Sequence, residues 1–387
     1  MRADRFINLD DARTAAKRVL PHVVFDYIDG AADDEHTMRA NREAFFDYAL
    51  VPRMARGSVH PDVSTDLAGC DLSLPVLLAP CGLVRAMHPA GGPGVARAAK
   101  NQGTVSVLST VAGNAVEEVC AAAPGSVWFQ LYAAGGRDEA ENLVSRAQAA
   151  GAQALVVTVD TPVLGNRERD RRHGVTPPLR LSGRNALHLG AQVLARPAWT
   201  ARAIKDGVKI ARARRSGGRP ATTRAGAVAM GASPFSWEDV SWLRSRWQRP
   251  LLVKGVLSSD DALRAVDAGA DGVIVSNHGG RQLDRTPGTL GVLPEIVAAV
   301  RQQDPSAAVL VDGGIRRGSD VVIAIALGAR AVLVGRPFLY ALSAAGQAGV
   351  EQVLSILHDE MVRTMALLGA ASLSDLDLSW VRRQPTP

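Results

Sequence analysis

Eight short apolar runs recur along the chain, each separated from the next by a longer stretch with helical character. The runs lie at 74–79, 105–108, 127–131, 154–159, 251–254, 272–275, 308–311 and 331–334. Strands that are apolar at nearly every position are typical of parallel sheets, because both faces of such a sheet are buried. Eight strand–helix units predict an α/β protein with a closed (β/α)8 TIM barrel, and an open doubly wound sheet is the alternative.

Polar and glycine-rich positions follow the ends of these predicted strands. In a barrel of this kind the active site lies at the carboxyl ends of the strands. Charged and amide groups are costly to bury there without partners, so we expect a ligand to supply some of those partners. The groups are Pro80-Cys81-Gly82, Ser109, Gln130, Tyr132, Thr158, Asp160, Lys254, Ser276 through Arg281, Asp312-Gly313-Gly314 and Gly335-Arg336.

The rest of the chain extends this barrel and does not form a second domain. We expect one domain over 1–387, with an N-terminal helical segment at 1–70, the barrel at 71–376 and a basic insertion loop at 177–235, after the fourth strand. The insertion holds eleven Lys and Arg residues and one acid, Asp206, which gives it a net charge of +10. Because the whole chain carries +6, the remainder carries −4, and the basic character belongs to the insertion.

The cysteine spacing, the histidine distribution and the N-terminal sequence argue against a disulfide-rich protein, a metalloprotein and a secreted or membrane-spanning protein. The three cysteines, Cys70, Cys81 and Cys120, form no close-spaced pair, so we expect neither a disulfide framework nor a thiolate metal site. The eight histidines are scattered, and no metal is predicted. Residues 1–10 lack the apolar core of a signal peptide, and no apolar run is long enough to span a bilayer. The expected location is the cytoplasm, either free or peripheral at the inner face of the membrane.

The segment 276–283, with the sequence SNHGGRQL, combines a base with an anion-binding group. It follows the predicted strand 272–275, so His278 and Arg281 are expected where that strand ends. An imidazole accepts a proton near neutral pH, and a guanidinium binds a carboxylate through two hydrogen bonds. This pair is typical of an enzyme that acts on a small organic acid.

The ends of the last two strands have the features of a phosphate site. Their motifs are Asp312-Gly313-Gly314-Ile315-Arg316 and Gly335-Arg336. Glycines let backbone N–H groups approach an anion, and each following helix presents its positive end. Barrels of this class commonly bind phosphate after strands seven and eight. Turn glycines without a ligand are the alternative.

Lys254 ends an otherwise apolar strand, where a lysine needs either a partner or a chemical role. It could stabilise negative charge that develops on a cofactor, or it could form a Schiff base with a carbonyl substrate. The phosphate motifs and the amide of Gln130 favour a flavin site over a Schiff base.

Asp160 follows the fourth predicted strand. Its carboxylate could orient His278 and stabilise the imidazolium that forms on proton uptake, and the alternative is a helix cap or turn residue. Hydroxyl donors and positive charges suited to an α-hydroxy carboxylate are supplied by Tyr27, Tyr132, Arg167 and Arg281.

These residues, in this order, resemble the FMN-dependent α-hydroxy acid oxidoreductases, the family of glycolate oxidase, lactate oxidase, flavocytochrome b2 and mandelate dehydrogenase. The resemblance runs from about Asn8 to Leu376. Its motifs are the N-terminal positions 20–27 and 41–42, the catalytic signature 276–284 and the phosphate loop 312–320.

The resemblance implies an oxidoreductase with FMN as its cofactor. It implies that His278 is the active-site base, that Asp160 is the partner of His278, and that Tyr132 and Lys254 are also catalytic. The residues implied to bind substrate are Tyr27, Tyr132, Arg167, His278 and Arg281. The residues implied to bind FMN are Pro80, Cys81, Gly82, Ser109, Gln130, Thr158, Lys254, Ser276, Asp312, Gly313, Gly314, Arg316, Gly335 and Arg336.

Two departures from the family pattern bear on the substrate. Many members have Pro-Thr-Ala where this chain has Pro80-Cys81-Gly82, and glycolate oxidase has a tryptophan where this chain has Val111. Both changes open space, and segment 162–170 resembles mandelate dehydrogenase. The resemblance therefore implies oxidation of a bulky (S)-2-hydroxy acid, such as mandelate, to the 2-oxo acid. (S)-Lactate is the alternative substrate.

The expected electron acceptor is a quinone or a carrier protein, with O2 as the alternative, and the family commonly forms homotetramers. Mandelate dehydrogenase carries a membrane-binding insertion at the place of 177–235. Apolar residues are interspersed with the basic ones in this segment, as is typical of contact with an anionic membrane surface, and the alternative is a solvated loop over the active site. No nucleic-acid partner is expected, because no zinc module or RNA-binding signature accompanies the basic residues.

Overall fold

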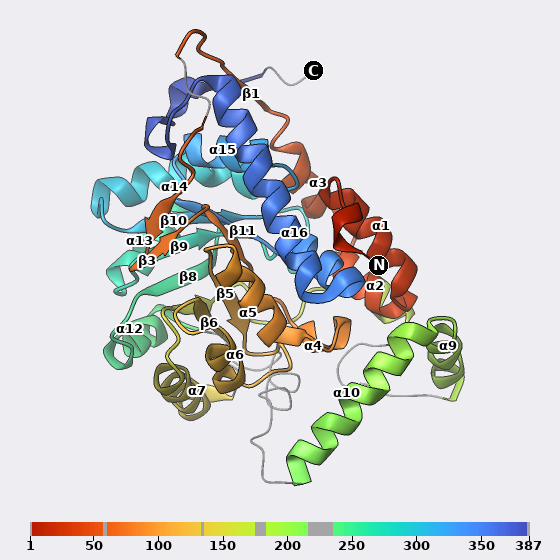
Figure 1. Cartoon of the computed structure of the whole chain (residues 1–387). Coiled ribbons are helices and arrows are strands. Elements are labelled where there is room, and N and C mark those ends of the chain that lie inside the picture. Colours follow the sequence, from red (N-terminus) through yellow and green to blue (C-terminus); the bar gives the residue numbers. More distant parts are fainter. Residues whose placement is uncertain (1, 57–59, 133–134, 175–182, 216–234, 385–387) are drawn as a thin grey trace.

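Eight parallel strands close into a barrel at the centre of the computed structural model (Figure 1). The structure describes residues 2–56, 60–132, 135–174, 183–215 and 235–384. In order around the barrel, the strands are β4 (Val76–Leu78), β5 (Ser106–Ser109), β6 (Val127–Leu131), β7 (Leu155–Thr158), β8 (Leu251–Val256), β9 (Gly272–Val275), β10 (Ala308–Asp312) and β11 (Ala331–Val334), and β11 pairs with β4. Each strand overlaps one of the predicted apolar runs, which confirms the (β/α)8 TIM barrel.

The barrel strands are apolar throughout because both of their faces are buried. Trp128, Val156 and Ile274 belong to the cluster that fills the barrel interior. Their neighbours Leu155 and Val157 belong to the larger core between the barrel and the helices. Burial on both faces explains why these strands show continuous apolar runs and no alternation.

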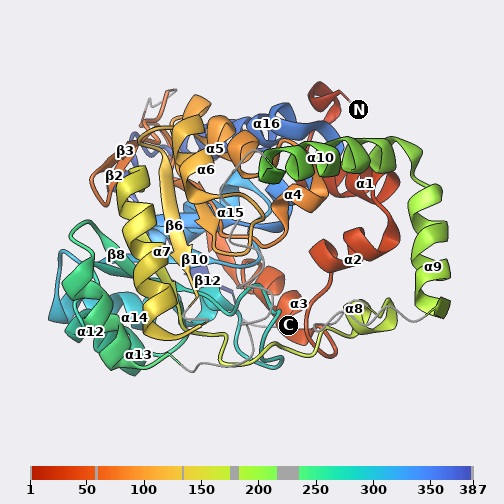
Figure 2. The same ribbon diagram turned by 90° about the horizontal axis from the view of Figure 1, so that it is seen from below.

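Helices follow the strands and surround the barrel (Figure 2). They are α4 (Val84–Met87), α5 (Gly91–Asn101), α6 (Val116–Ala122), α7 (Gly136–Ala150), α8 (Glu168–Arg172), α12 (Trp237–Arg246), α13 (Ser259–Asp267), α14 (Thr289–Gln303), α15 (Gly318–Ala326) and α16 (Arg336–Leu368). Side-chain caps fix where some of them begin, since the hydroxyls of Ser236 and Ser258 accept backbone N–H groups in the first turns of α12 and α13. The helix α16 is interrupted at Gly346, whose φ is +65°.

An N-terminal segment packs against one side of the barrel and reaches its carboxyl end. It contains α1 (Leu9–Val19), α2 (His22–Asp29) and α3 (His36–Glu43). Short pieces complete the fold: η1 (Ala3–Arg5), β1 (Tyr48–Leu50), the hairpin β2 (Thr65–Leu67) and β3 (Cys70–Leu72), η2 (Leu373–Asp375), η3 (Leu378–Trp380), and β12 (Val381–Arg383), which pairs with β1. The turn between α2 and α3 binds the loop after β9, because Ala32 N donates to Gly280 O and Thr37 N donates to Asp284.

Two helices, α9 (Gly183–Leu194) and α10 (Pro197–Arg215), occupy the described part of the basic insertion. The charge pattern predicts a loop here, whereas the structure has two helices. The segment is rich in alanine, leucine and arginine, which are good helix formers. Residues 177–182 and 216–234 of the predicted insertion, and the basic side chains they contribute, lie outside the described residues.

Both insertion helices lie outside the ring of barrel helices (Figures 1 and 2). They contact the protein through α2 and α4, since Gln192 Oε1 accepts a hydrogen bond from Val23 N at 2.8 Å and Asp206 pairs with Arg85 at 2.8 Å. Among the helices of the described residues, none has both the length and the apolar character that crossing a bilayer requires.

Candidate active site

A pocket lies at the carboxyl ends of the barrel strands. The predicted site residues that line it are Tyr27, Pro80, Cys81, Gly82, Tyr132, Arg167, Lys254, His278, Arg281, Asp312, Gly313, Gly314, Arg316, Gly335 and Arg336. The structure therefore brings together residues that are as much as 309 positions apart in the sequence, from Tyr27 to Arg336.

The other predicted residues lie beside this lining at the strand ends. They are Ser109, Gln130, Thr158, Asp160 and Ser276. The parallel register pairs Ser109 with Gln130 and Thr158 with Lys254. Ser109 Oγ donates to Gln130 Oε1 at 2.8 Å, and Ser276 Oγ accepts a hydrogen bond from Lys254 Nζ at 2.6 Å. The strand ends thus connect these buried polar residues to the pocket wall.

His278 and Asp160 form a partly buried pair, with Nδ1 of the imidazole 3.0 Å from Asp160 Oδ1. The Nε2 atom lies 3.5 Å from the Tyr132 hydroxyl. Burial lowers the pKa of His278 below its usual range, although Asp160 opposes this shift. Burial raises the pKa of Asp160, but His278 and Lys254 outweigh it, so the net pKa is lowered and the carboxylate is ionised. An ionised carboxylate only accepts, so Nδ1 carries the proton and Nε2 is left as the basic atom.

The backbone of His278 is left-handed, with a φ of +58°. This conformation is uncommon for residues other than glycine and has a free-energy cost. It turns the chain sharply after β9, and Gly279 and Gly280 continue the turn with positive φ angles. The glycines of the motif are therefore needed to bring His278 to the pocket.

Lys254 is buried and lies 3.1 Å from Asp312 Oδ2. Burial lowers the pKa of this amine, but Asp312 and Asp160 more than offset that effect, and the net pKa is raised. Lys254 therefore stays protonated at neutral pH. Because a Schiff base requires a neutral amine, this charge favours the charge-stabilising role over the Schiff-base alternative.

Two guanidinium groups meet at one end of the pocket. Arg281 Nη1 donates to Tyr27 O at 2.7 Å and to Gly30 O at 2.9 Å. Arg167 makes two longer hydrogen bonds, to Arg281 O at 3.4 Å and to Gln282 Oε1 at 3.3 Å. Burial, together with the charge of Arg281, lowers the pKa of Arg167 to about 10. In the part of the chain that the structure describes, neither guanidinium forms an ion pair, so this end suits a carboxylate ligand.

A second positive region lies after β10 and β11. Arg316 and Arg336 are at the pocket, and burial lowers the pKa of both, that of Arg336 to about 10. Arg336 is the first residue of α16, so the positive end of that helix also points to this region. A phosphate would neutralise these charges.

Gly313 and Gly314 have φ angles of +99° and +83°. A Cβ on Gly314 would collide with the carbonyl oxygen of Asn41, at the start of the last turn of α3. Close packing of α3 therefore requires glycine at 314, and the turn-glycine interpretation accounts for part of this motif. The phosphate site stays a prediction.

At the strand ends beside the pocket, four buried polar atoms have no hydrogen-bond partner among the described residues. They are Gln130 Nε2, Thr158 Oγ1, Asp160 Oδ2 and Asp312 Oδ1. Such atoms are costly to leave unpaired in a folded protein. Together with the partly buried Arg316 and Arg336, they fit FMN, whose ring edge has donors and acceptors and whose phosphate is an anion.

Sequence reasoning missed three polar residues of the site. Gln282 Nε2 donates to Asp160 O at 3.0 Å, while its Oε1 accepts from Arg167, so it links the backbone of Asp160 to the guanidinium of Arg167. Asn41 and Asn277 exchange two side-chain hydrogen bonds of 2.8 Å. All three residues lie inside the motifs that carry the family resemblance. Their hydrogen-bond partners are distant in the sequence, so the local sequence does not predict these contacts.

Comparison with known proteins places the chain in a family. The family model of FMN-dependent dehydrogenases matches residues 16–383. The chain is 39% identical over 381 residues to peroxisomal (S)-2-hydroxyacid oxidase GLO3 of Arabidopsis thaliana, with 98% of each chain covered. It is 43% identical over 371 residues to glycolate oxidase 1 of Zea mays, with 95% of this chain and 94% of that one covered.

A solved structure agrees with these relatives. The crystal structure of the monotopic membrane protein (S)-mandelate dehydrogenase is similar to this one with a TM-score of 0.87, at 36% sequence identity, covering 98% of this chain and 100% of that one. The predicted family and cofactor are thereby confirmed: this chain belongs to the FMN-dependent dehydrogenase family, and it is an FMN-dependent oxidoreductase that oxidises a 2-hydroxy acid.

Proposed function

We propose that this enzyme oxidises a bulky (S)-2-hydroxy acid, such as mandelate, and passes the electrons to a quinone or a carrier protein. The observation that carries the choice of a bulky substrate is the small wall at Gly82 and Val111. A Cβ on Gly82 would lie 2.9 Å from the Tyr27 hydroxyl and 3.1 Å from Val111 Cγ2, so these two side chains pack closely on the backbone of Gly82, and a side chain at 82 would have to displace them into the pocket. Gly82 and Val111 both line the pocket, and the short side chain at 111 leaves more of this side to the substituent of the substrate than a tryptophan would.

The substrate is oriented by groups at two ends of the pocket. Its carboxylate binds Arg167 and Arg281, where two positive charges are not neutralised by the protein, and Tyr27 lies beside them. Its hydroxyl lies near His278 Nε2 and the hydroxyl of Tyr132. This placement directs the substituent toward the small wall.

Oxidation of a 2-hydroxy acid to a 2-oxo acid releases two electrons and two protons. FMN, when bound, would accept the two electrons together with one of the protons. His278 takes up the other proton at Nε2, and Asp160 stabilises the imidazolium that results. Lys254 and Tyr132 supply a fixed positive charge and a neutral hydroxyl, because burial raises the pKa of the Tyr132 phenol.

The residues proposed to hold FMN divide into two groups. Those for the ring are Pro80, Cys81, Gly82, Ser109, Gln130, Thr158, Lys254 and Ser276. Those for the ribityl chain and phosphate are Asp312, Gly313, Gly314, Arg316, Gly335 and Arg336. Burial raises the pKa of the Cys81 thiol to about 12, so it contacts the ring as a neutral thiol. A Cβ on Gly335 would have only ordinary contacts, the nearest at 3.6 Å, so the wall is open there.

A substitution at the small wall tests the choice of substrate. Val111→Trp fills the space beside Gly82, so we expect the ratio of kcat/KM for (S)-mandelate to that for glycolate to fall about 10- to 100-fold, the range typical of hydrophobic pocket contacts. Val111→Ala, which keeps the space open, should preserve the preference. An unchanged ratio in Val111→Trp would contradict the bulky-substrate proposal.

One observation favours a second candidate, an oxidase that uses O2. The relatives from Arabidopsis thaliana and Zea mays are both named oxidases. Admitting air to the substrate-reduced enzyme separates the two proposals, because an oxidase recovers its flavin absorption within one turnover time. A dehydrogenase recovers it only when a quinone or carrier is added.

Association with an anionic membrane surface is part of the proposal. Leu194 of α9 and Ile204 of α10 are 78% and 63% exposed, and Lys205 next to Ile204 is exposed too. Exposed apolar side chains next to basic ones are typical of interfacial helices.

A further inference from the structure

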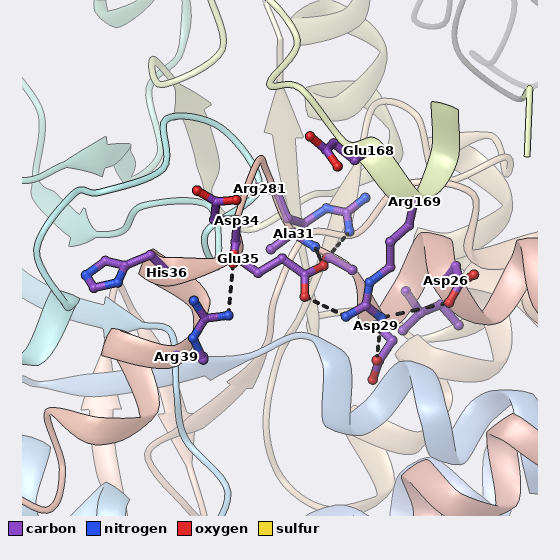
Figure 3. Close-up of polar contacts among 12 residues, drawn as sticks. Asp26, Asp29, Ala31, Asp34, Glu35, His36, Arg39, Glu168, Arg169 and Arg281 are labelled. Carbon is purple, nitrogen blue, oxygen red and sulfur yellow. Dashed lines mark hydrogen bonds and ion pairs between the residues drawn. The ribbon is translucent and has the colours of Figure 1, made fainter. Parts of the chain in front are cut away.

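Two arginines at the start of the short helix α8 have different surroundings. Arg167, its N-cap residue, lines the pocket. Arg169 is not part of the pocket lining, and its guanidinium lies beside the carboxylates of Asp26, Asp29 and Glu35 (Figure 3).

Arg169 binds acids from two parts of the N-terminal segment. Its Nη1 donates to Asp29 Oδ2 at 2.9 Å, and its Nη2 donates to Glu35 Oε2 at 2.5 Å. Asp26 lies 3.8 Å away. Glu35 also accepts a hydrogen bond from Ala31 N at 3.0 Å, which fixes the turn that connects α2 to α3. Arg169 therefore joins α8 to both ends of this turn.

The same turn holds the second substrate-side arginine. A Cβ on Gly30 would lie 3.1 Å from Arg169 Cδ, so the stem of Arg169 packs against this residue. The carbonyl oxygen of Gly30 accepts hydrogen bonds from Arg281 at 2.9 Å and from Arg336 at 2.8 Å. Displacement of Gly30 would therefore move the anchor of Arg281.

Arg167 and Arg281 repel each other while no carboxylate lies between them. The hydrogen bonds of Arg167, at 3.3 and 3.4 Å, are too long to hold it firmly against that repulsion. The ion pairs of Arg169 act on the same short helix and attract it toward α2.

We propose that Arg169 is a positioning residue, which holds Arg167 and Arg281 together in the free enzyme by binding α8 to the turn between α2 and α3. The inference rests on the proposed function, in which those two arginines bind the substrate carboxylate. Arg169 itself is not among the described residues that line the pocket.

The test is calorimetric titration of the FMN-loaded enzyme with benzoate, a carboxylate that cannot be oxidised, and with its neutral counterpart benzamide. Arg169→Met should weaken benzoate binding about 10- to 100-fold and benzamide binding far less, because misplacement of about 1 Å costs up to that factor. Arg169→Lys, which keeps the charge, should recover part of the loss.

Arg172→Met is the matched control, because it removes the same charge from the same helix. The Arg172 side chain is 71% exposed and pairs only with Glu168 among the described residues, so its variant should bind benzoate like the wild type. Glu35→Gln provides a second route to the same effect if Arg169→Met does not retain FMN, and it too should weaken benzoate more than benzamide.

The outcomes separate this inference from the proposed function. Normal benzoate binding in an Arg169→Met enzyme that retains FMN overturns the positioning role alone, as does an equal loss for benzoate and benzamide. If the wild-type enzyme binds neither benzoate nor (S)-mandelate, the proposed carboxylate site is wrong, and this inference fails with it.

Discussion

At the scale of single residues, His278 is the proposed base, and its surroundings suit that role. It is partly buried, its backbone is left-handed, and its Nδ1 is engaged by Asp160, so its Nε2 is the atom left free to accept a proton. Its lowered pKa keeps the imidazole unprotonated at neutral pH. The imidazole of His278 is therefore already in the form that can accept a proton from the substrate.

Replacing this base should remove most of the activity without removing the cofactor. We expect His278→Ala to lower the rate of flavin reduction by at least about 10² to 10⁴-fold, the range for a general base, and to keep its FMN. The wild-type rate should hold as pH falls to the usual histidine range and decline only below it, because the base must be unprotonated and its pKa is lowered.

Asp160→Asn serves as the control for this pH profile. The carboxylate raises the pKa of His278, so its removal should move the acid limb to still lower pH while the rate itself falls. Stopped-flow reduction between pH 4 and 9 would measure both effects. Near-normal turnover in His278→Ala, or an acid limb above pH 7 in the wild type, would contradict the assignment.

The sequence identified these residues but did not predict how they are connected. The sequence predicts that Arg281 binds the substrate carboxylate. The structure adds that the backbone carbonyls of Tyr27 and Gly30 accept hydrogen bonds from its guanidinium. The Asn41–Asn277 pair spans 236 positions. No local pattern encodes a contact of that separation, because it depends on how the N-terminal segment packs against the finished barrel.

At the scale of elements, the strands were predictable and the insertion was less so. Burial on both faces leaves a continuous apolar run in each barrel strand, and that signal is local to the sequence. In the insertion, the charge pattern predicts a loop, but the structure has the helices α9 and α10 there. The amino-acid composition of this segment favours helix, and that signal outweighs the charge pattern.

Vesicle sedimentation tests what these two helices do. At low salt, we expect the enzyme to pellet with anionic vesicles and to stay in the supernatant with neutral ones, since each engaged Lys or Arg contributes about 1 kcal/mol. Ile204→Glu should reduce the pelleted fraction because it removes an exposed apolar contact and adds a negative charge.

Ile7→Glu is the matched control, because Ile7 is 82% exposed and lies outside the insertion, just before α1. It should pellet like the wild type. Equal supernatant fractions with anionic and neutral vesicles would remove the membrane proposal and leave the solvated-segment alternative.

At the scale of the whole molecule, the active site depends on parts that are distant in sequence. The barrel supplies His278, Lys254 and the proposed phosphate region, whereas the N-terminal segment supplies Tyr27 and the carbonyls that hold Arg281 and Arg336. The fold class and the place of the site followed from the strand pattern alone. The homotetramer expected from the family resemblance stays a prediction, because it depends on surfaces of a second copy.

The most direct test of the central claim is the visible spectrum of the purified enzyme under anaerobic conditions, before and after addition of (S)-mandelate and, separately, (S)-lactate. We predict a flavin spectrum that (S)-mandelate bleaches quickly and at low concentration, with (S)-lactate slower. Bleaching by (S)-lactate alone would contradict the bulky substrate, and a bound flavin that neither acid bleaches would contradict the proposed function.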